Sequence, residues 1–192
     1  MTIERILMRS ASDQSTQLPA RQCEMPTTAE LLAATKSSDW RQPNPDNTLV
    51  LTLATGKVVI ELRPDIAPGH VERMKQLIAE KFYDGIVFHR VIPGFMAQTG
   101  CPRGTGTGGS SYPNLEQEFN EAPHVRGTCS MARASHPDTA NSQFFICFDD
   151  ARFLDRNYTV WGEVISGMEN VDKIKRGEPV RDPDKIVKAT MS

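Results

Sequence analysis

The amino-acid sequence predicts a mainly β domain of many short strands with only two helices, a pattern that suggests a barrel but does not fix the strand count or its closure. Apolar and polar residues alternate in several short runs, and glycine, proline and asparagine residues separate these runs. Only two stretches of the same region have the spacing of an amphipathic helix. A barrel suits many short strands because closure hides the strand edges. A length of 192 residues allows one well-filled core but not two ordinary domains.

The first part of the chain differs from the rest. Residues 1–25 are polar and have no sustained apolar period, which is typical of a disordered tail. The segment from Thr28 to Thr35 predicts a short helix, and the break-forming sequence RQPNPDN follows it. We therefore expect a partly disordered N-terminal extension over residues 1–46 and one compact domain over residues 47–192.

The compact domain begins with a predicted β-hairpin. TLVLTL (48–53) and KVVIEL (57–62) both place their apolar residues at period two, and the turn Thr55-Gly56 joins them. Helices are predicted from Pro68 to about Phe82 and from Met168 to Lys175, the second closed by glycine and proline. Further short strands are expected at Ile86–Ile92, Phe95–Gln98, Thr128–Ala132, Gln143–Phe148, Val160–Val164 and Ile186–Met191.

Charge and composition narrow the possible partners. A net charge of −2 and a pI near 6.1 argue against binding to nucleic acid or to anionic lipid. No apolar run approaches the ~20 residues of a membrane helix, and the N-terminus has no apolar signal core, so a cytoplasmic location is expected. The four cysteines form no CxxC pair, which predicts free thiols and no metal site.

Three stretches carry a more specific signal. FHRVIPGFMAQTG (88–100) places the charged Arg90 among apolar residues, and alternate residues along a strand share one face. SMARASHPDTANSQFFICF (130–148) and RFLDRNYTVWGEV (152–164) are the other two. Together these stretches resemble the signature segments of the cyclophilins, in the same order and at nearly the same spacing, from about Asn47 to Met191.

The resemblance to cyclophilins implies an eight-stranded antiparallel barrel capped by two α-helices. It also implies peptidyl-prolyl cis/trans isomerase activity without a cofactor, in a domain that is commonly a monomer. Proline-containing peptides and unfolded or folding proteins are the implied partners. By position, the implied catalytic residues are Arg90 and Gln98. The implied substrate-binding residues are His89, Ile92, Phe95, Met96, Ala132, Arg133, Ala134, Gln143, Phe145, Phe153, Leu154 and Tyr158.

These residue types suit rotation about an X–Pro bond. Amide resonance imposes a barrier of about 18–20 kcal/mol, and no bond has to break, so neither a nucleophile nor a metal is needed. In the twisted amide the prolyl nitrogen recovers a lone pair, to which a permanently charged guanidinium can donate. Arg90 is the expected donor, the apolar residues form a socket for the proline ring, and Gln98 orients the substrate backbone or Arg90.

Several positions depart from the cyclophilin pattern. Phe153 stands where cyclosporin-sensitive members have tryptophan, and it lacks the indole N–H, so weak cyclosporin binding is expected. Tyr158 replaces a common histidine, and Arg133 replaces the usual asparagine and adds a positive charge that favours acidic residues near the proline. Phenylalanine and tyrosine at these positions also resemble bacterial members.

Other interpretations remain open at this stage. A non-catalytic proline-binding or chaperone module would use the same groove without turnover, and residues 1–46 could form an arm that docks a partner. His89 lies next to Arg90 and therefore on the opposite strand face, where a structural role is at least as plausible as substrate contact. RGTGTGGSS (103–111) lacks the spacing of a phosphate-binding loop and is interpreted as a flexible loop beside the site.

Overall fold

The computed structural model describes residues 44–192, so the helix expected at Thr28–Thr35 and Cys23 lie outside the described residues. The described residues belong to one compact unit, Pro43–Ser192. Its elements in chain order are η1 Pro45–Asn47, β1 Thr48–Leu53, β2 Gly56–Leu62, α2 Pro68–Ala79, β3 Arg90–Ile92, β4 Met96–Thr99, β5 Thr128–Met131, η2 Pro137–Thr139, β6 Phe144–Cys147, η3 Arg152–Leu154, β7 Val160–Ser166, α3 Met168–Val171 and β8 Ile186–Met191.

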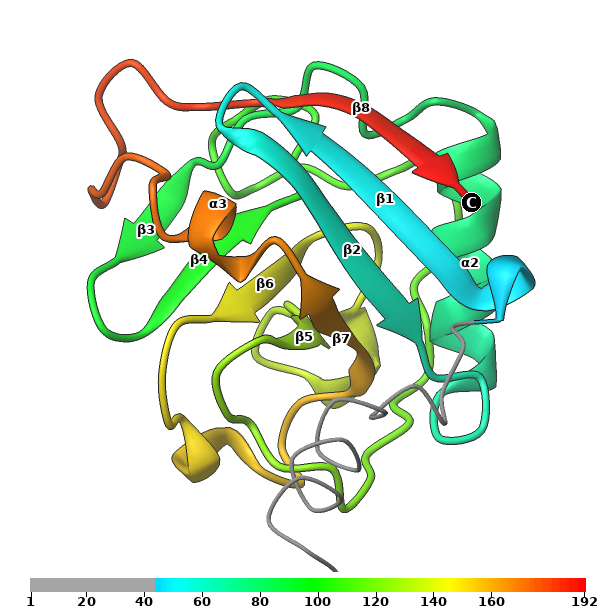
Figure 1. Ribbon diagram of the computed structural model, residues 1–192. Coiled ribbons are helices and arrows are strands. Elements are labelled where there is room, and N and C mark those ends of the chain that lie inside the picture. The colour runs from blue at the N-terminus through cyan, green and yellow to red at the C-terminus, as the bar shows by residue number, and fades with distance from the viewer. Residues whose placement is uncertain (1–43) are drawn as a thin grey trace, which may run out of the picture. The chain divides into compact units, whose positions relative to one another are not determined.

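Within residues 44–192, eight antiparallel strands form one curved sheet in the order β3-β4-β6-β5-β7-β2-β1-β8 (Figure 1). The end strands β3 and β8 do not pair with each other. Instead, residues 85–88 before β3 bind residues 184–186 through the backbone bonds Gly85 N to Ile186 O (2.7 Å), Ile186 N to Ile86 O (2.9 Å) and Phe88 N to Asp184 O (2.8 Å). The prediction of an eight-stranded antiparallel fold is confirmed, and short backbone contacts join the two ends of the sheet.

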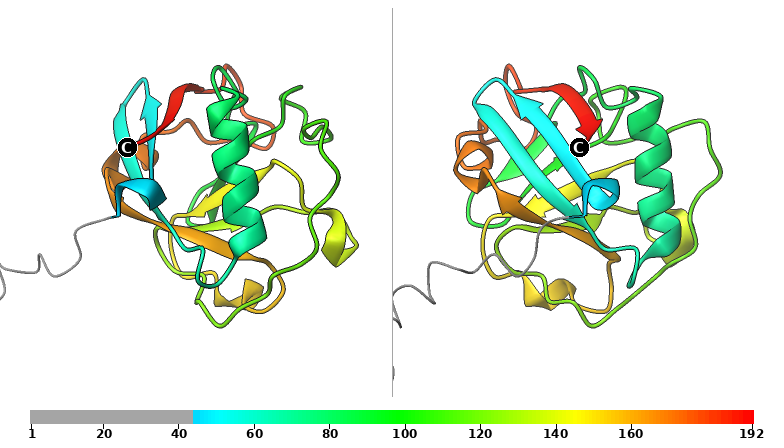
Figure 2. Two further views of the ribbon diagram at one scale, coloured as in Figure 1. Left: turned by 90° about the vertical axis from the view of Figure 1, so that its right-hand side faces the viewer. Right: turned by 45° about the vertical axis from the view of Figure 1, so that its right-hand side comes forward.

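The hairpin and the first helix form where the sequence predicts them. The alternating apolar residues of β1 and β2 are buried, and α2 packs beside β8, which lies between β1 and the helix (Figure 2). Pro68 occupies the first turn of α2, where its missing N–H has no partner to lose. The Glu118 carboxylate accepts the free N–H groups of Gly69 and His70, both at 2.9 Å, and so caps this helix.

The helix α2 ends earlier than the sequence predicts. The amide of Phe82 donates to Leu77 O at 2.9 Å, and that of Lys81 donates to Ile78 O at 2.9 Å. Lys81 has a φ of 57°, so this is a Schellman C-terminus with the left-handed residue at Lys81. The helical spacing continues to Phe82 because the motif packs an apolar residue back onto the helix.

Two other predicted elements are too long. The second helix, α3, ends at Val171 instead of Lys175, because the Lys175 amide donates to the Asp184 carboxylate at 2.8 Å instead of to a helical carbonyl. The strand predicted at Ile86–Ile92 is paired as β3 only from Arg90, because the residues before it contact residues 184–186. Of the four cysteines, the three within the described residues, Cys101, Cys129 and Cys147, are buried free thiols, as predicted.

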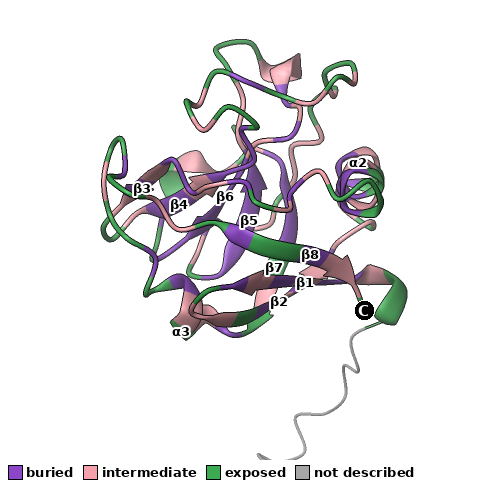
Figure 3. Cartoon of the chain, turned by 90° about the horizontal axis from the view of Figure 1, so that it is seen from above, coloured by how far each residue is buried: buried purple, intermediate pink, exposed green. Residues whose placement is uncertain are grey.

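The strand β6 separates two apolar clusters. Phe144 and Ile146 belong to the main core between the sheet and α2, where Phe144 makes edge contacts with Tyr83 at 5.5 Å and Trp161 at 5.4 Å. The alternate residues Phe145 and Cys147 belong to a smaller cluster on the other face. Both faces of β6 are therefore buried (Figure 3), and period two assigns neighbouring phenylalanines to different clusters.

Candidate functional site

The hairpin of β3 and β4 brings the predicted catalytic pair together. Arg90 lies opposite Gln98, and Ile92 lies opposite Met96, so these four residues share one face. Gly94 has a φ of 68° in the connecting turn, a conformation that favours glycine. On the other side of β4, Gln98 lies opposite Phe145 of β6. A row of side chains thus runs across three strands from Arg90 to Phe145.

The side chains of this row line a small socket of about 120 Å³, most of whose lining residues are apolar. Phe145 is buried, contacts the Tyr158 ring edge-on at 5.8 Å and stacks on the His124 ring at 6.2 Å. At the rim, Phe95 contacts the ring of Phe153, which is 71% exposed. The residues that line the socket are Arg90, Phe95, Met96, Gln98, Ala132, Arg133, Phe145, Leu154 and Tyr158.

Arg90 is held at the mouth of this socket with part of its guanidinium available. Its side chain is 39% exposed, and its Nε donates to the carboxylate of Glu178. Within residues 44–192 its two terminal amino groups make no hydrogen bond. These groups are free to donate to a ligand in the socket.

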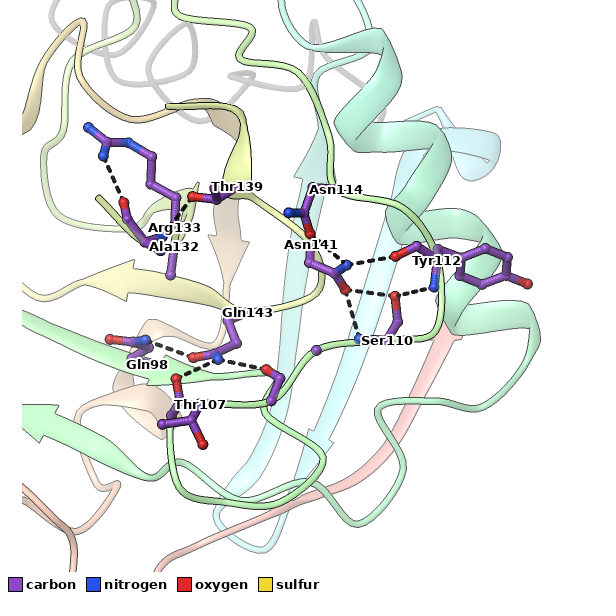
Figure 4. A pocket seen from close by; sticks show the side chains of 14 residues that line it. Gln98, Thr107, Ser110, Tyr112, Asn114, Ala132, Arg133, Thr139, Asn141 and Gln143 are labelled. Carbon is purple, nitrogen blue, oxygen red and sulfur yellow. Dashed lines mark hydrogen bonds between the residues drawn. The ribbon is translucent and has the colours of Figure 1, made fainter. Parts of the chain in front are cut away.

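Gln98 is fixed through a second glutamine. Its Nε2 donates to Gln143 Oε1 at 3.0 Å, and Gln143 Nε2 donates in turn to the carbonyls of Gly106 and Gly108, both at 2.8 Å. The chain of bonds links β4 to the glycine-rich loop (Figure 4). Residues 103–111, expected to be a flexible loop, are therefore tied to the groove by side-chain hydrogen bonds.

A second, larger cavity of about 590 Å³, lined mostly by polar residues and glycines, adjoins the socket and shares Gln98, Ala132 and Arg133 with it (Figure 4). Asn141 organises its far side: Oδ1 accepts from Ser110 N and Ser110 Oγ, both at 2.7 Å, and Nδ2 donates to Tyr112 O at 2.9 Å. The other residues that line it are Gly106, Thr107, Gly108, Gly109, Asn114, Ala134, Thr139 and Gln143. Most of these residues are not predicted from the sequence, although the glycine-rich run indicates a loop at the site.

The Arg133 guanidinium joins the segment that follows β5 to the segment that precedes β7. It donates to Ala134 O at 2.9 Å, to Ser135 O at 3.2 Å and to Asn157 O at 3.2 and 3.0 Å, and it lies 4.7 Å from the centre of the Tyr158 ring. Its partners among the described residues are carbonyls and a ring, so its positive charge is not neutralised by a carboxylate. The Arg133 amide makes no backbone hydrogen bond within the described part of the chain, and an extended peptide can pair with it.

Three of the predicted binding residues line neither cavity: His89, Ile92 and Phe153. Ile92 packs beneath the socket, and Phe153 stands at its exposed rim. His89 is buried on the opposite side of β3 from Arg90, close to Gly106, and neither ring nitrogen has a hydrogen-bond partner among the described residues. Burial and the nearby positive charge of Arg90 lower its pKa.

Ser130, His124 and Asp155 are arranged like a nucleophilic triad behind the socket. His124 Nδ1 lies 2.8 Å from Asp155 Oδ1, and its Nε2 lies 3.0 Å from Ser130 Oγ. However, Ser130 is fully buried, and its hydroxyl donates its one hydrogen to Thr159 O at 3.0 Å. Burial lowers the pKa of His124 although Asp155 opposes this effect. The triad therefore supports the ring of Phe145 from behind and does not reach a substrate.

No group of three histidine, cysteine or acidic side chains within residues 44–192 could hold a metal ion. None of the helices in this same part of the chain is long and apolar enough to cross a membrane.

Comparison with known proteins gives one consistent result. A family model described as "Cyclophilin type peptidyl-prolyl cis-trans isomerase/CLD" matches residues 48–191. A "Probable peptidyl-prolyl cis-trans isomerase" of Brucella suis biovar 1 (strain 1330) is 54% identical over 164 residues, which cover 77% of this chain and 84% of that protein. "Peptidyl-prolyl cis-trans isomerase B" of Bacillus subtilis (strain 168) is 46% identical over 127 residues, which cover 66% of this chain and 88% of that protein.

Solved structures agree with these sequence matches. The crystal structure of cyclophilin AquaCyp293 from Hirschia baltica has a TM-score of 0.74 and 30% identity, and the match covers 88% of this chain and 81% of that one. A Cryptosporidium parvum cyclophilin type peptidyl-prolyl cis-trans isomerase, crystallised in the presence of the dipeptide Ala-Pro, has a TM-score of 0.71 and 29% identity, with 76% of this chain and 98% of that one covered.

Proposed function

This chain belongs to the cyclophilin-type peptidyl-prolyl cis-trans isomerases, and we propose that its Arg90 and Gln98 act on the X–Pro bond. It is an isomerase that catalyses rotation about this bond. The observation that carries the proposal is the position of Arg90, whose terminal amino groups are free at the mouth of an apolar socket. A non-catalytic proline-binding module is the less favoured alternative.

The chemistry follows from what changes during rotation. Twisting the amide removes its resonance and returns a lone pair to the prolyl nitrogen, and a guanidinium N–H of Arg90 donates to that lone pair. This contact is stronger in the twisted state than in either planar state, which is the condition for catalysis. A barrier lowered by about 4 kcal/mol accelerates rotation about a thousandfold.

The other groove residues hold the substrate. The proline ring occupies the socket of Phe95, Met96, Phe145, Leu154 and Tyr158, a concave and largely apolar site. The peptide backbone pairs with the strand extension at Ala132, Arg133 and Ala134, while Gln98 and Gln143 orient a flanking carbonyl or N–H. The adjoining polar cavity receives a residue next to the proline, since it shares lining residues with the socket.

We further propose a cytoplasmic, monomeric enzyme that assists the folding of proteins, as a chaperone does. Residues 47–192 are its isomerase domain, and residues 1–46 are an extension. Its partners are proline-containing proteins. The net charge of −2 argues against nucleic acid and anionic membranes as partners. Cyclosporin binds weakly because Phe153 offers no N–H. Light scattering on purified protein measures its molar mass and so tests whether it is a monomer.

The test compares wild type with Arg90→Ala in a peptide isomerisation assay and in proline-limited refolding. We expect wild type to accelerate both, and Arg90→Ala to lose at least about a hundredfold in kcat/KM. Arg126→Ala, which removes another partly exposed ion pair at a residue that lines neither cavity, is the matched control and keeps its activity. Near-normal turnover by folded Arg90→Ala would contradict the role of Arg90, and an inactive, folded wild type would favour the binding module.

A further inference from the structure

The carboxylate of Glu178 binds Arg90 at the Nε edge of its guanidinium, 88 positions away in the sequence. We propose that Glu178 is a positioning residue: it fixes the plane of the guanidinium and leaves both terminal amino groups for the substrate. The proposal rests on the catalytic role of Arg90 proposed above.

The backbone holds Glu178 beside β3. Gly177 and Val91 exchange two backbone hydrogen bonds of 2.8 Å, and Val180 N donates to His89 O at 3.2 Å. Glu178 therefore lies between two sets of backbone hydrogen bonds that hold residues 177–180 against the outer edge of β3, the end strand of the sheet. A Cβ on Gly177 would lie 2.8 Å from both Pro179 O and Val180 Cα, so this close path requires glycine. The placement of Glu178 is thus set by the backbone and not by its own side chain.

The bond from Arg90 Nε to Glu178 is suited to orienting the guanidinium, and it does not compete with the substrate for the terminal nitrogens. An arginine guanidinium is planar, and its Nε–H and terminal N–H groups point in fixed relative directions. A carboxylate on Nε defines the plane of the group without using the two terminal nitrogens, which make no hydrogen bond within residues 44–192. A competitor of the substrate would instead occupy those terminal nitrogens. Without Glu178, the guanidinium samples more orientations, and fewer of them donate to the twisted amide.

The kinetic test uses Glu178→Ala, Glu178→Gln and Asp182→Ala in the full chain. Asp182 forms an exposed ion pair with Lys175 further along the same loop, so its replacement is the matched control. We expect Glu178→Ala to lower kcat about fivefold, the upper range for an exposed ion pair, with KM within about twofold. Glu178→Gln keeps an acceptor oxygen and recovers most of kcat, and Asp182→Ala matches wild type. An unchanged or raised kcat in folded Glu178→Ala overturns the proposal.

A second measurement does not depend on activity. In ¹⁵N NMR spectra the Arg90 Nε–H signal is assigned by its absence from Arg90→Ala, and the signal reports the hydrogen bond that Nε donates. We expect Glu178→Ala to shift this signal and Asp182→Ala to leave it in place. An unshifted signal refutes the pairing itself. If the pairing is observed but wild type shows no isomerase activity, the proposed function fails and not the assignment of Glu178 as the partner of Arg90.

Discussion

Gln143 connects the two sides of the groove through one side chain, which makes its replacement a sharp test of how the site is held together. It accepts one hydrogen bond from Gln98 and donates two, to the carbonyls of Gly106 and Gly108. Gln143→Ala removes all three bonds, whereas Gln98→Ala removes only the first. The pair of variants therefore isolates the contribution of the two bonds to the loop.

The magnitude follows from the number and the burial of these bonds. A typical intramolecular hydrogen bond contributes about 1 kcal/mol net, and a buried group left without a partner costs more. Gly108 is buried, while Gly106 is partly exposed, so water replaces the bond to Gly106 in part. We expect Gln143→Ala to lower the free energy of unfolding by about 2–3 kcal/mol, and Gln98→Ala by about 1 kcal/mol.

Urea denaturation of the two variants and of the double variant measures these free energies. Hydrogen exchange adds a local readout: amides of residues 101–109 exchange faster in Gln143→Ala than in Gln98→Ala, because only the first variant frees the loop. Equal loss of stability in the two single variants, with equal exchange rates in the loop, would refute this account of the groove.

Three further predictions concern substrate, ligand and pH. Phe153→Trp adds an indole N–H at the rim and should tighten cyclosporin binding about fivefold in a titration, the value of one hydrogen bond. Wild type should prefer a glutamate over a lysine beside the proline by about threefold in kcat/KM at low salt, and Arg133→Asn should remove this preference. Stability should fall below pH 6.5, because burial lowers the pKa of His70, His89 and His124, and the unfolded chain then binds protons that the folded chain does not.

A specific measurement would contradict each of these three predictions. Unchanged cyclosporin affinity in Phe153→Trp would show that the rim position does not contact this ligand. Peptides with either charge turned over at equal rates by wild type would remove the role of Arg133 in specificity. Each of these histidines adds a slope of up to about 1.4 kcal/mol per pH unit to the free energy of unfolding between its folded pKa and pH 6.5. Above pH 6.5 the histidine is neutral in both states and costs no stability. A free energy of unfolding that stays flat from pH 7.5 to 5 would contradict their neutral, buried state.

The site residues illustrate how far local pattern extends. Period two along FHRVIPGFMAQTG pairs Arg90 with Ile92 and Met96 with Gln98, and the structure adds that Arg90 lies directly opposite Gln98. The same rule separates Phe144 from Phe145. The ends of elements were less predictable, because Asp184 captures the Lys175 amide and so ends α3 early. Asp184 lies nine residues after Lys175, outside the short segment from which helical spacing is judged.

The sequence by itself determined the position of most strands, the faces of their residues and, through its resemblance to cyclophilins, the family. The tertiary structure alone decided which distant groups meet there: Asn141 with Ser110 at the polar cavity, and Glu178 with Arg90 at the socket. Side-chain direction along a strand follows from the geometry of neighbouring residues, so a short segment encodes it. Partners 31 or 88 positions apart meet only after the sheet has brought their loops together, and no local period records that meeting.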